Sequence, residues 1–202
     1  MNILNIKNEL SEQLLAACQQ SLQKIVEDFT SSLSKDRIYA FVLYPSSGFV
    51  DFGLAYSTRE SLAKINEKMS SFIKDNSDLL IDNKGSIIPD DYCELTACEW
   101  DYIWPHFECF ENINDFLDEN FDLFYEAEME PDEINLLFKG IVINVFFELL
   151  KRKSFDAHCF ENDLLLGVQF PDGNNTDLIK SISKEVNSEY WHQKFIKVVE
   201  SD

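Results

Sequence analysis

Glycine is scarce in this sequence, which has 6 glycines among 202 residues. The glycine-rich loops that cradle phosphate groups in nucleotide-binding proteins are absent, and so is the Gly-x-Ser-x-Gly turn that presents the nucleophile of many hydrolases. The sequence therefore gives no support to a dinucleotide-binding protein, a P-loop enzyme or an α/β-hydrolase.

Long uninterrupted apolar runs are also missing. The longest apolar stretch, Ile134–Leu150, is slightly short for a membrane span, and it is interrupted by Asn135, Lys139, Asn144 and Glu148. The first residues lack the basic region, apolar run and small-residue cleavage site of a secretory signal. We therefore expect no membrane association and a cytoplasmic location.

The cysteines do not suggest a disulfide framework. There are 5 of them, an odd number, in a chain large enough to fold without covalent cross-links. With 45% hydrophobic residues and 17 phenylalanines, the chain can bury a core rich in aromatic rings. Reduced thiols in a cytoplasmic protein are therefore the simpler interpretation. The cysteines are Cys18, Cys93, Cys98, Cys109 and Cys159.

Basic residues are the most conspicuous absence. The chain carries 37 acidic and 17 basic residues, for a net charge of -20, and no lysine or arginine occurs between Lys84 and Lys139. That interval holds 16 of the acidic residues, which leaves 21 acids against 17 bases elsewhere. The acidity thus belongs to one segment. It argues against nucleic acid and anionic membranes as partners, because phosphate binding requires lysine and arginine.

The early part of the chain predicts one helix followed by a β-hairpin. Apolar residues recur at intervals of three or four from Ile3 to Leu33, which is typical of an amphipathic helix. The segments Arg37–Tyr44 and Phe49–Tyr56 are rich in β-branched and aromatic residues, and they flank a Pro-Ser-Ser-Gly turn. We expect these two segments to pair as antiparallel strands.

Later segments predict further helices and strands. Ser57 and Glu60 have the spacing of a capping box that opens a helix over about Thr58–Lys74. Pro131 and the carboxylates that follow it fit the first turn of a helix that runs to about Lys151. We also expect a short strand at Tyr92–Trp100, a strand at Asp163–Phe170 and a closing helix at Thr176–Val199.

Together these elements predict an α+β fold in which an antiparallel sheet, including the early hairpin, packs with several helices. The length suits a single domain that spans residues 1–202. The acidic helical segment lies within this domain at about residues 85–138.

Four residues of metal-binding types follow one another in the acidic segment, at Cys93, Cys98, His106 and Cys109. Structural zinc sites normally use close pairs of ligands separated by a longer loop. The spacing here has no such pairs, and cysteines in an apolar strand behave as small hydrophobic residues. We therefore predict no bound metal and no other cofactor.

The sequence offers two arrangements to weigh for catalysis. His158 and Cys159 are adjacent, and adjacent residues of a strand point to opposite faces, which prevents a thiolate–imidazolium pair. Asp118 with Asp122, or Asp122 with Glu126, falls on one helical face. A carboxylate general acid needs a dry cleft, whereas a run this dense in acids is expected to lie in water. We predict no enzymatic activity, with a metal-dependent or carboxylate enzyme as an alternative.

The acidic run favours an interaction surface. A surface that only keeps a protein soluble normally mixes both signs of charge, and a bland acidic surface is the alternative here. A basic protein partner would be attracted to this run, and aromatic side chains at its edge would supply apolar anchors. The predicted contact residues are the carboxylates Glu111, Asp115, Asp118, Glu119, Asp122 and Glu126 and the aromatic residues Phe121 and Tyr125.

Three parts of the chain carry a family resemblance, namely Phe41–Glu60, Trp100 with Tyr102, and Leu164–Asp172. In this order they resemble the bacterial domain-of-unknown-function family numbered 4303, from about Arg37 to the C-terminal helix. The resemblance implies small, soluble bacterial proteins, often encoded near polymorphic or contact-dependent toxins, that look like immunity proteins. The family has no agreed catalytic residues, so the resemblance carries none to this chain.

Charge pattern and resemblance together predict a cytoplasmic immunity protein that binds and neutralises a cognate antibacterial toxin. Many such toxins are nucleases or act on nucleotides, and an acidic surface with aromatic anchors would fit their basic clefts. A DNA-mimic or other acidic regulatory binding protein is the alternative. Its acids would be spaced like phosphates, and it would bind many DNA-binding proteins rather than one toxin.

Overall fold

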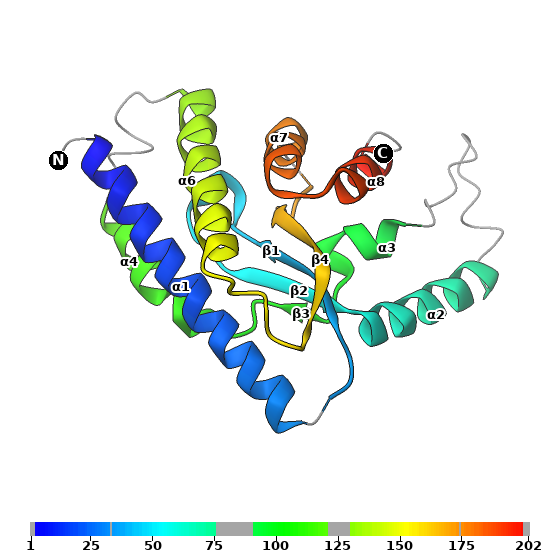
Figure 1. The fold of residues 1–202 in the computed structure, drawn as a ribbon. Helices are drawn as coiled ribbons and strands as arrows, with labels where there is room; N and C mark the ends of the chain where they lie inside the picture. Colours follow the sequence, from blue (N-terminus) through cyan, green and yellow to red (C-terminus); the bar gives the residue numbers. More distant parts are fainter. Residues whose placement is uncertain (1–2, 33, 76–90, 121–129, 174, 200–202) are drawn as a thin grey trace, which may run out of the picture.

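The computed structural model describes residues 3–32, 34–75, 91–120, 130–173 and 175–199 of the chain. Within these ranges, seven α-helices surround a four-stranded sheet in the order β3-β2-β1-β4 (Figure 1). The strands are β1 (Ile38–Leu43), β2 (Leu54–Thr58), β3 (Tyr102–Ile103) and β4 (Phe160–Val168). The predicted α+β class, with an early hairpin and several packed helices, is confirmed.

The hairpin of β1 and β2 is antiparallel, as predicted. Its second strand starts at Leu54 rather than at Phe49, because Ser47–Phe49 forms a short 3-10 helix, η1, in place of a tight turn. Phe49 has a φ of 60° and is fully buried, and its ring stacks on Phe138 with 4.3 Å between ring centroids. Burial of this ring against a distant helix therefore sets where the strand begins.

The sheet is mixed. β2 also pairs antiparallel with β3, but β4 runs parallel to β1. The chain reaches β4 through the long helix α6 (Pro131–Lys151), which has the predicted bounds, and helical crossovers of this kind join parallel strands. The antiparallel arrangement expected from the hairpin therefore holds for three strands, and the fourth is the exception.

Strand β1 sends aromatic side chains to two layers of helices. Phe41 contacts Phe146 of α6 with 6.5 Å between ring centroids, whereas Tyr39 stacks on Trp191 of α8 (Glu189–Val199) at 6.1 Å. Residues two apart in a regular strand share a face. The pairing register of β1 shifts near its start, however, and this β-bulge turns Tyr39 away from the face of Phe41.

Helices α1 (Ile3–Ser31) and α2 (Arg59–Asp75) lie where the sequence predicts them. The predicted capping box at the start of α2 is wrong by one residue. The hydroxyl oxygen of Thr58 accepts a hydrogen bond from the backbone N–H of Ser61 at 3.1 Å, whereas Ser57 is fully buried in β2. The strand continues one residue further than expected, so the next hydroxyl residue becomes the cap.

The segment Tyr92–Trp100, expected as a strand, forms helix α3 (Tyr92–Leu95) and the 3-10 helix η2 (Ala97–Glu99). The side chain of Gln169 accepts a hydrogen bond from the first N–H of η2 and donates one to the last carbonyl of α3, each at 2.7 Å. These bonds use backbone groups that a strand would offer to a neighbouring strand. A residue distant in sequence thus decides the local structure.

The predicted closing helix is two helices, α7 (Thr176–Val186) and α8, which are separated at Asn187. The side chain of Asn187 accepts a hydrogen bond from the backbone N–H of Leu166 at 2.7 Å and donates one to its carbonyl at 2.8 Å. The hydrogen bonds at this break therefore connect α7 and α8 to β4.

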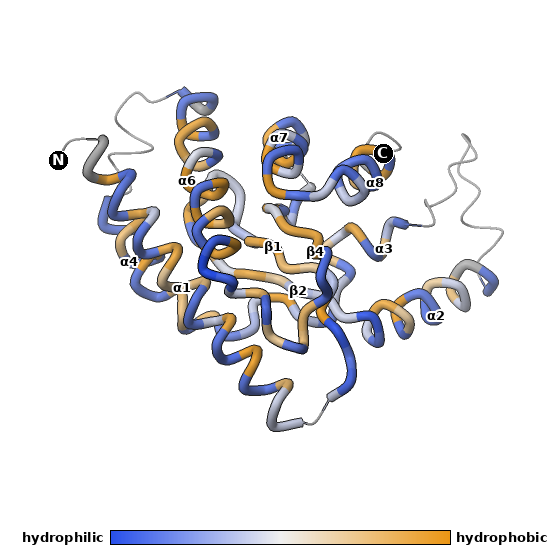
Figure 2. Tube along the Cα trace, viewed as in Figure 1, coloured by the Kyte–Doolittle hydropathy of each residue, from blue (hydrophilic) through white to orange (hydrophobic). Residues whose placement is uncertain are grey.

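The apolar side chains of helices and strands meet in one buried cluster. Figure 2 shows hydrophobic stretches gathered along the strands and along the sides of α1 and α6. In the described part of the chain, no helix is long and apolar enough to cross a membrane. The remaining elements, η3 (Phe107–Phe110) and α4 (Glu111–Glu119), pack against α1 and carry part of the acidic segment.

Candidate functional site

Helix α4 presents four of the predicted contact residues to solvent. Its other side, with Ile113 and Leu117 buried, packs toward α1. The exposed carboxylates, which we call the α4 face, are Glu111, Asp115, Asp118 and Glu119. Among the described residues, none of the four has an ion-pair or side-chain hydrogen-bond partner. This face is therefore available to another molecule.

The other four predicted contact residues, Phe121, Asp122, Tyr125 and Glu126, lie outside the described residues. Their roles at an interface stay predictions. The same holds for the proposed pairing of Asp118 with Asp122 on one helical face.

Exposed aromatic side chains lie in the segment that leads into α4. Trp104 and Phe107 are 42% and 38% exposed, with 5.6 Å between ring centroids. The indole ring packs on Gly53, where an added Cβ would lie 2.7 Å from it, and its N–H donates to the carbonyl of Tyr44 at 3.1 Å. Both Trp104 and His106 have a positive φ, which is uncommon outside glycine and occurs often at functional sites. Anchored yet exposed rings of this kind suit a protein interface.

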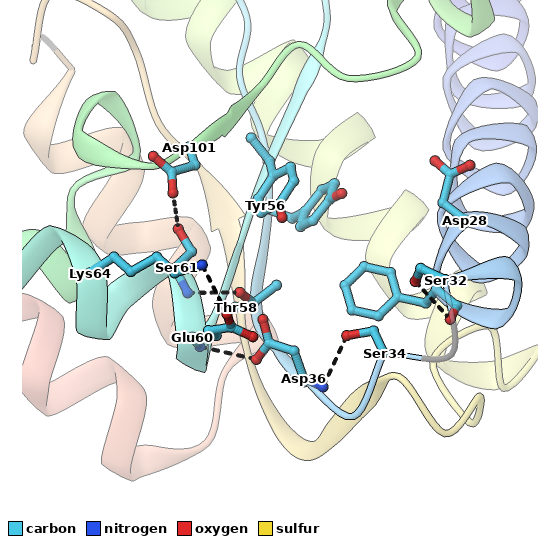
Figure 3. A pocket seen from close by; sticks show the side chains of 12 residues that line it. Asp28, Ser32, Ser34, Asp36, Tyr56, Thr58, Glu60, Ser61, Lys64 and Asp101 are labelled. Carbon is cyan, nitrogen blue, oxygen red and sulfur yellow. Dashed lines mark hydrogen bonds and ion pairs between the residues drawn. The ribbon is translucent and has the colours of Figure 1, made fainter.

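A cleft of about 310 Å³ opens between the end of α1, the start of α2 and strands β2 and β3 (Figure 3). We call it the acidic cleft, because carboxylates and hydroxyl groups dominate its wall and Lys64 is the one basic residue among the described residues that line it. Sequence analysis singled out none of its carboxylates as contact residues. They are Asp28, Asp36, Glu60 and Asp101.

Neutral donors hold two of these carboxylates in place. Asp36 accepts hydrogen bonds from the backbone N–H groups of Arg37 at 2.8 Å and Glu60 at 3.0 Å. Asp101 accepts one from the hydroxyl of Ser61 at 2.7 Å. Because these donors carry no charge, they fix the carboxylates without neutralising them.

The other two carboxylates contact ionisable side chains. Glu60 pairs with Lys64 at 2.8 Å, and both side chains are exposed, so solvent screens the pair and it contributes little to stability. Asp28 lies 3.1 Å from Nε2 of His106, which precedes η3. This contact joins the acidic cleft to the segment that leads into α4.

A second cluster of charges is more deeply placed. Arg59 binds Glu94 at 2.6 Å and Glu161 through two hydrogen bonds of 2.8 Å each, and its guanidinium lies 4.3 Å from the centre of the Tyr39 ring. Lys194 of α8 also pairs with Glu94. The cluster joins α2, α3, β4 and α8, and its charges are matched within the chain. We therefore assign it to packing.

The candidate metal ligands of the sequence do not meet. Cys93 and Cys109 are buried, Cys98 is exposed, and His106 contacts Asp28. Within the described ranges, no group of three or more His, Cys, Asp or Glu residues is placed to hold a metal ion. The prediction that the chain binds no metal stays a prediction, argued from ligand spacing.

His158 and Cys159 lie just before β4. His158 is exposed whereas Cys159 is buried, so the two side chains face different surroundings. Burial raises the pKa of the Cys159 thiol. A protonated, buried thiol is a poor nucleophile. The two residues lie in a turn rather than on a strand as expected, and the absence of a catalytic pair stays a prediction.

Comparisons with protein-family models, curated proteins and solved structures gave no match for this chain. The resemblance to family 4303 therefore rests on its short motifs. Of these, Trp100 is buried and donates its indole N–H to the carbonyl of Cys93 at 3.1 Å, whereas Tyr102 lines the acidic cleft.

Proposed function

We propose that this chain is a binding protein whose α4 face neutralises a basic protein partner by covering its positive surface. The observation that carries the proposal is the α4 face itself, four exposed carboxylates without a partner among the described residues. The exposed rings of Trp104 and Phe107 precede it in the chain. In line with the resemblance to family 4303, the partner is a cognate antibacterial toxin, a nuclease fits best, and the chain is a cytoplasmic immunity protein.

The α4 face lowers the stability of the helix that carries it. Asp115 lies one turn from both Glu111 and Glu119, and like charges at this spacing destabilise a helix by about 0.2–0.5 kcal/mol per pair. No lysine or arginine occurs in α4 to relieve this repulsion. Binding of a basic partner would replace this repulsion with attraction. A role in binding therefore explains the carboxylates, whereas a role in stabilising the helix does not.

Charge and aromatic anchors would contribute to binding in different ways. An acidic field speeds the encounter with a basic protein by about 10- to 1,000-fold. Exposed ion pairs add little affinity, about 0–1 kcal/mol each, so buried aromatic contacts must supply most of the rest. The partner surface is therefore expected to place arginine and lysine around an apolar pocket.

Replacing Asp115 and Asp118 with lysine is expected to abolish protection of cells against the toxin while the protein stays folded. A lysine at position 115 would lie one turn from Glu111 and Glu119, so the melting temperature should stay equal or rise slightly. Each reversal exchanges an attraction to the partner for a repulsion, and two together should weaken binding by at least about 100-fold. Survival of toxin-exposed cells and thermal circular dichroism measure the two effects.

The matched control is the pair Glu67→Lys and Glu185→Lys, on exposed positions of α2 and α7. It changes the net charge by the same amount and should protect as well as the wild type. Full protection by the Asp115→Lys/Asp118→Lys variant would contradict the proposal. An equal loss of protection in the control variant would show that protection depends on net charge rather than on the α4 face.

A further inference from the structure

The acidic cleft has a wall suited to a positively charged organic group. We propose that it binds a guanidinium or ammonium group, carried by an arginine or lysine side chain of a protein or by a free polyamine. The inference goes beyond the proposed function, because no residue of α4 lines the cleft. The volume of about 310 Å³ is large enough for such a group.

The charge of the wall selects a cation. Its carboxylates come from α1, the connection after α1, the first turn of α2 and the residue before β3. In the part of the chain that the structure describes, Lys64 is the one base on this wall. The hydrogen bonds that hold these carboxylates leave oxygen lone pairs for the N–H groups of a ligand. A phosphate or another anion would instead meet net repulsion.

The carboxylates surround a volume rather than converge on one point. Across the described residues, no three His, Cys, Asp or Glu side chains are close enough to hold a metal ion. The matching cation is therefore larger than a metal ion and distributes its N–H donors over several oxygens. Guanidinium and polyamine groups have this property.

Tyr56 provides an observation that is independent of the carboxylates. Its side chain lines the cleft between Asp101 and Asp28 (Figure 3) and is only 4% exposed, yet no described residue hydrogen-bonds its hydroxyl. Burial raises the pKa of this hydroxyl, and the nearby Tyr102 and Asp28 raise it further. The hydroxyl therefore stays protonated. The hydroxyl oxygen is thus held in a buried residue at the wall of the cleft, with its lone pairs unused by the described residues. An N–H group of a ligand in the cleft can donate to this oxygen.

Aromatic rings add a second attraction for a cation. Tyr56 and Tyr102 are stacked with 4.4 Å between ring centroids, and Phe29 meets Tyr56 edge-on at 6.4 Å. A cation within about 6 Å of an aromatic ring face is attracted by the π electrons. Neutral aromatic rings beside fixed carboxylates are therefore a favourable setting for a guanidinium or ammonium group.

Titration of the full chain with three probes tests the proposal. The probes are N-acetyl-arginine amide, spermidine and the uncharged isostere N-acetyl-citrulline amide, followed by calorimetry and by the tyrosine ring signals in NMR spectra. At least one charged probe should bind saturably, and the uncharged isostere should not. Tighter binding of the arginine probe assigns a protein side chain as the source of the cation, and tighter binding of spermidine assigns a free polyamine.

Two variants locate the binding in the cleft. Asp101→Asn should weaken it by at least about tenfold, the effect of losing one charge-assisted hydrogen bond. Tyr102→Leu should weaken it as well, and since Tyr102 is 37% exposed the fold should persist. The matched control Asp156→Asn, at an exposed position between α6 and β4, should bind as the wild type does.

Three results would overturn the proposal. They are no saturable binding of either charged probe to the folded protein at millimolar concentration, equal binding of the uncharged isostere, and wild-type affinity in the Asp101→Asn variant. None of these measurements involves the α4 face. A failure of the cleft proposal is therefore distinguishable from a failure of the proposed function.

Discussion

Replacing Phe138 with alanine is expected to lower the free energy of unfolding by about 3–5 kcal/mol, as for other buried phenylalanines. Its ring is fully buried in α6, stacks on Phe49 at 4.3 Å between centroids and lies 5.8 Å from the ring of Phe52. Rigid neighbouring rings cannot collapse into the space it would leave. For a chain of this size each kcal/mol shifts the melting temperature by about 2–4 °C, so thermal circular dichroism should show a fall of roughly 10 °C.

Phe147→Ala is the matched control for this substitution. Phe147 lies on the same helix, but its side chain is 47% exposed. Its removal should change the free energy of unfolding by less than about 1 kcal/mol. Similar losses in the two variants would contradict the orientation of α6 against the hairpin.

Replacing Glu94 with alanine is expected to cost about 2–4 kcal/mol. Glu94 is buried, and its two carboxylate oxygens bind Arg59, at 2.6 Å, and Lys194. Removing one partner of a buried ion pair generally costs about 3–5 kcal/mol, because a charge is left unpaired. Arg59 would keep Glu161 and Lys194 would keep Asp91 at 3.0 Å, which reduces the loss here. Urea unfolding of the variant and the wild type at neutral pH measures the difference.

The stabilisation by the cluster of Arg59, Glu94 and Lys194 depends on pH. Burial lowers the pKa of Lys194, but hydrogen bonds and attraction from Glu94 and Asp91 outweigh burial and raise it. Because the folded-state pKa is above the unfolded value, the stabilisation is fully present at neutral pH. It is lost as the pH rises above about 10.

The matched control is Glu60→Ala. Glu60 forms an exposed ion pair with Lys64 that solvent screens, so breaking it should leave the free energy of unfolding nearly unchanged. If Glu94→Ala destabilised the protein no more than Glu60→Ala does, the structural role of the buried cluster would be wrong.

The parts of the fold that follow from local pattern were predictable from the sequence. The apolar spacing of α1 and the first turn of α6 at Pro131 gave the correct elements. The errors occur where a distant residue decides the outcome. Asn187 ends α7 by binding β4, and Gln169 joins α3 to η2, and neither contact leaves a signal in neighbouring residues.

Of the two candidate surfaces, one was likewise predictable from the local sequence and the other was not. The exposure of the α4 face was expected because a run so dense in acids lies in water, and the structure adds that Ile113 and Leu117 form the buried side of the helix. The acidic cleft was not predictable, because Asp28 and Asp101 come from segments that only tertiary packing brings together. Each of these two acids stands next to an aromatic residue, Phe29 or Tyr102, but the same pairing recurs elsewhere in the chain, as at Asp51 and Phe52, so it marks no site.

The most direct test of the account is capture of the partner from native cells at low and at high salt. The baits are the tagged wild type, the Asp115→Lys/Asp118→Lys variant and the Glu67→Lys/Glu185→Lys control. Salt at physiological strength already screens exposed charges over about 8 Å, and more salt screens them further. We expect one basic protein to be retained at low salt by the wild type and the control, to be lost at high salt, and not to be retained by the α4 variant. Retention of the same protein by the α4 variant, or no partner at either salt, would contradict it.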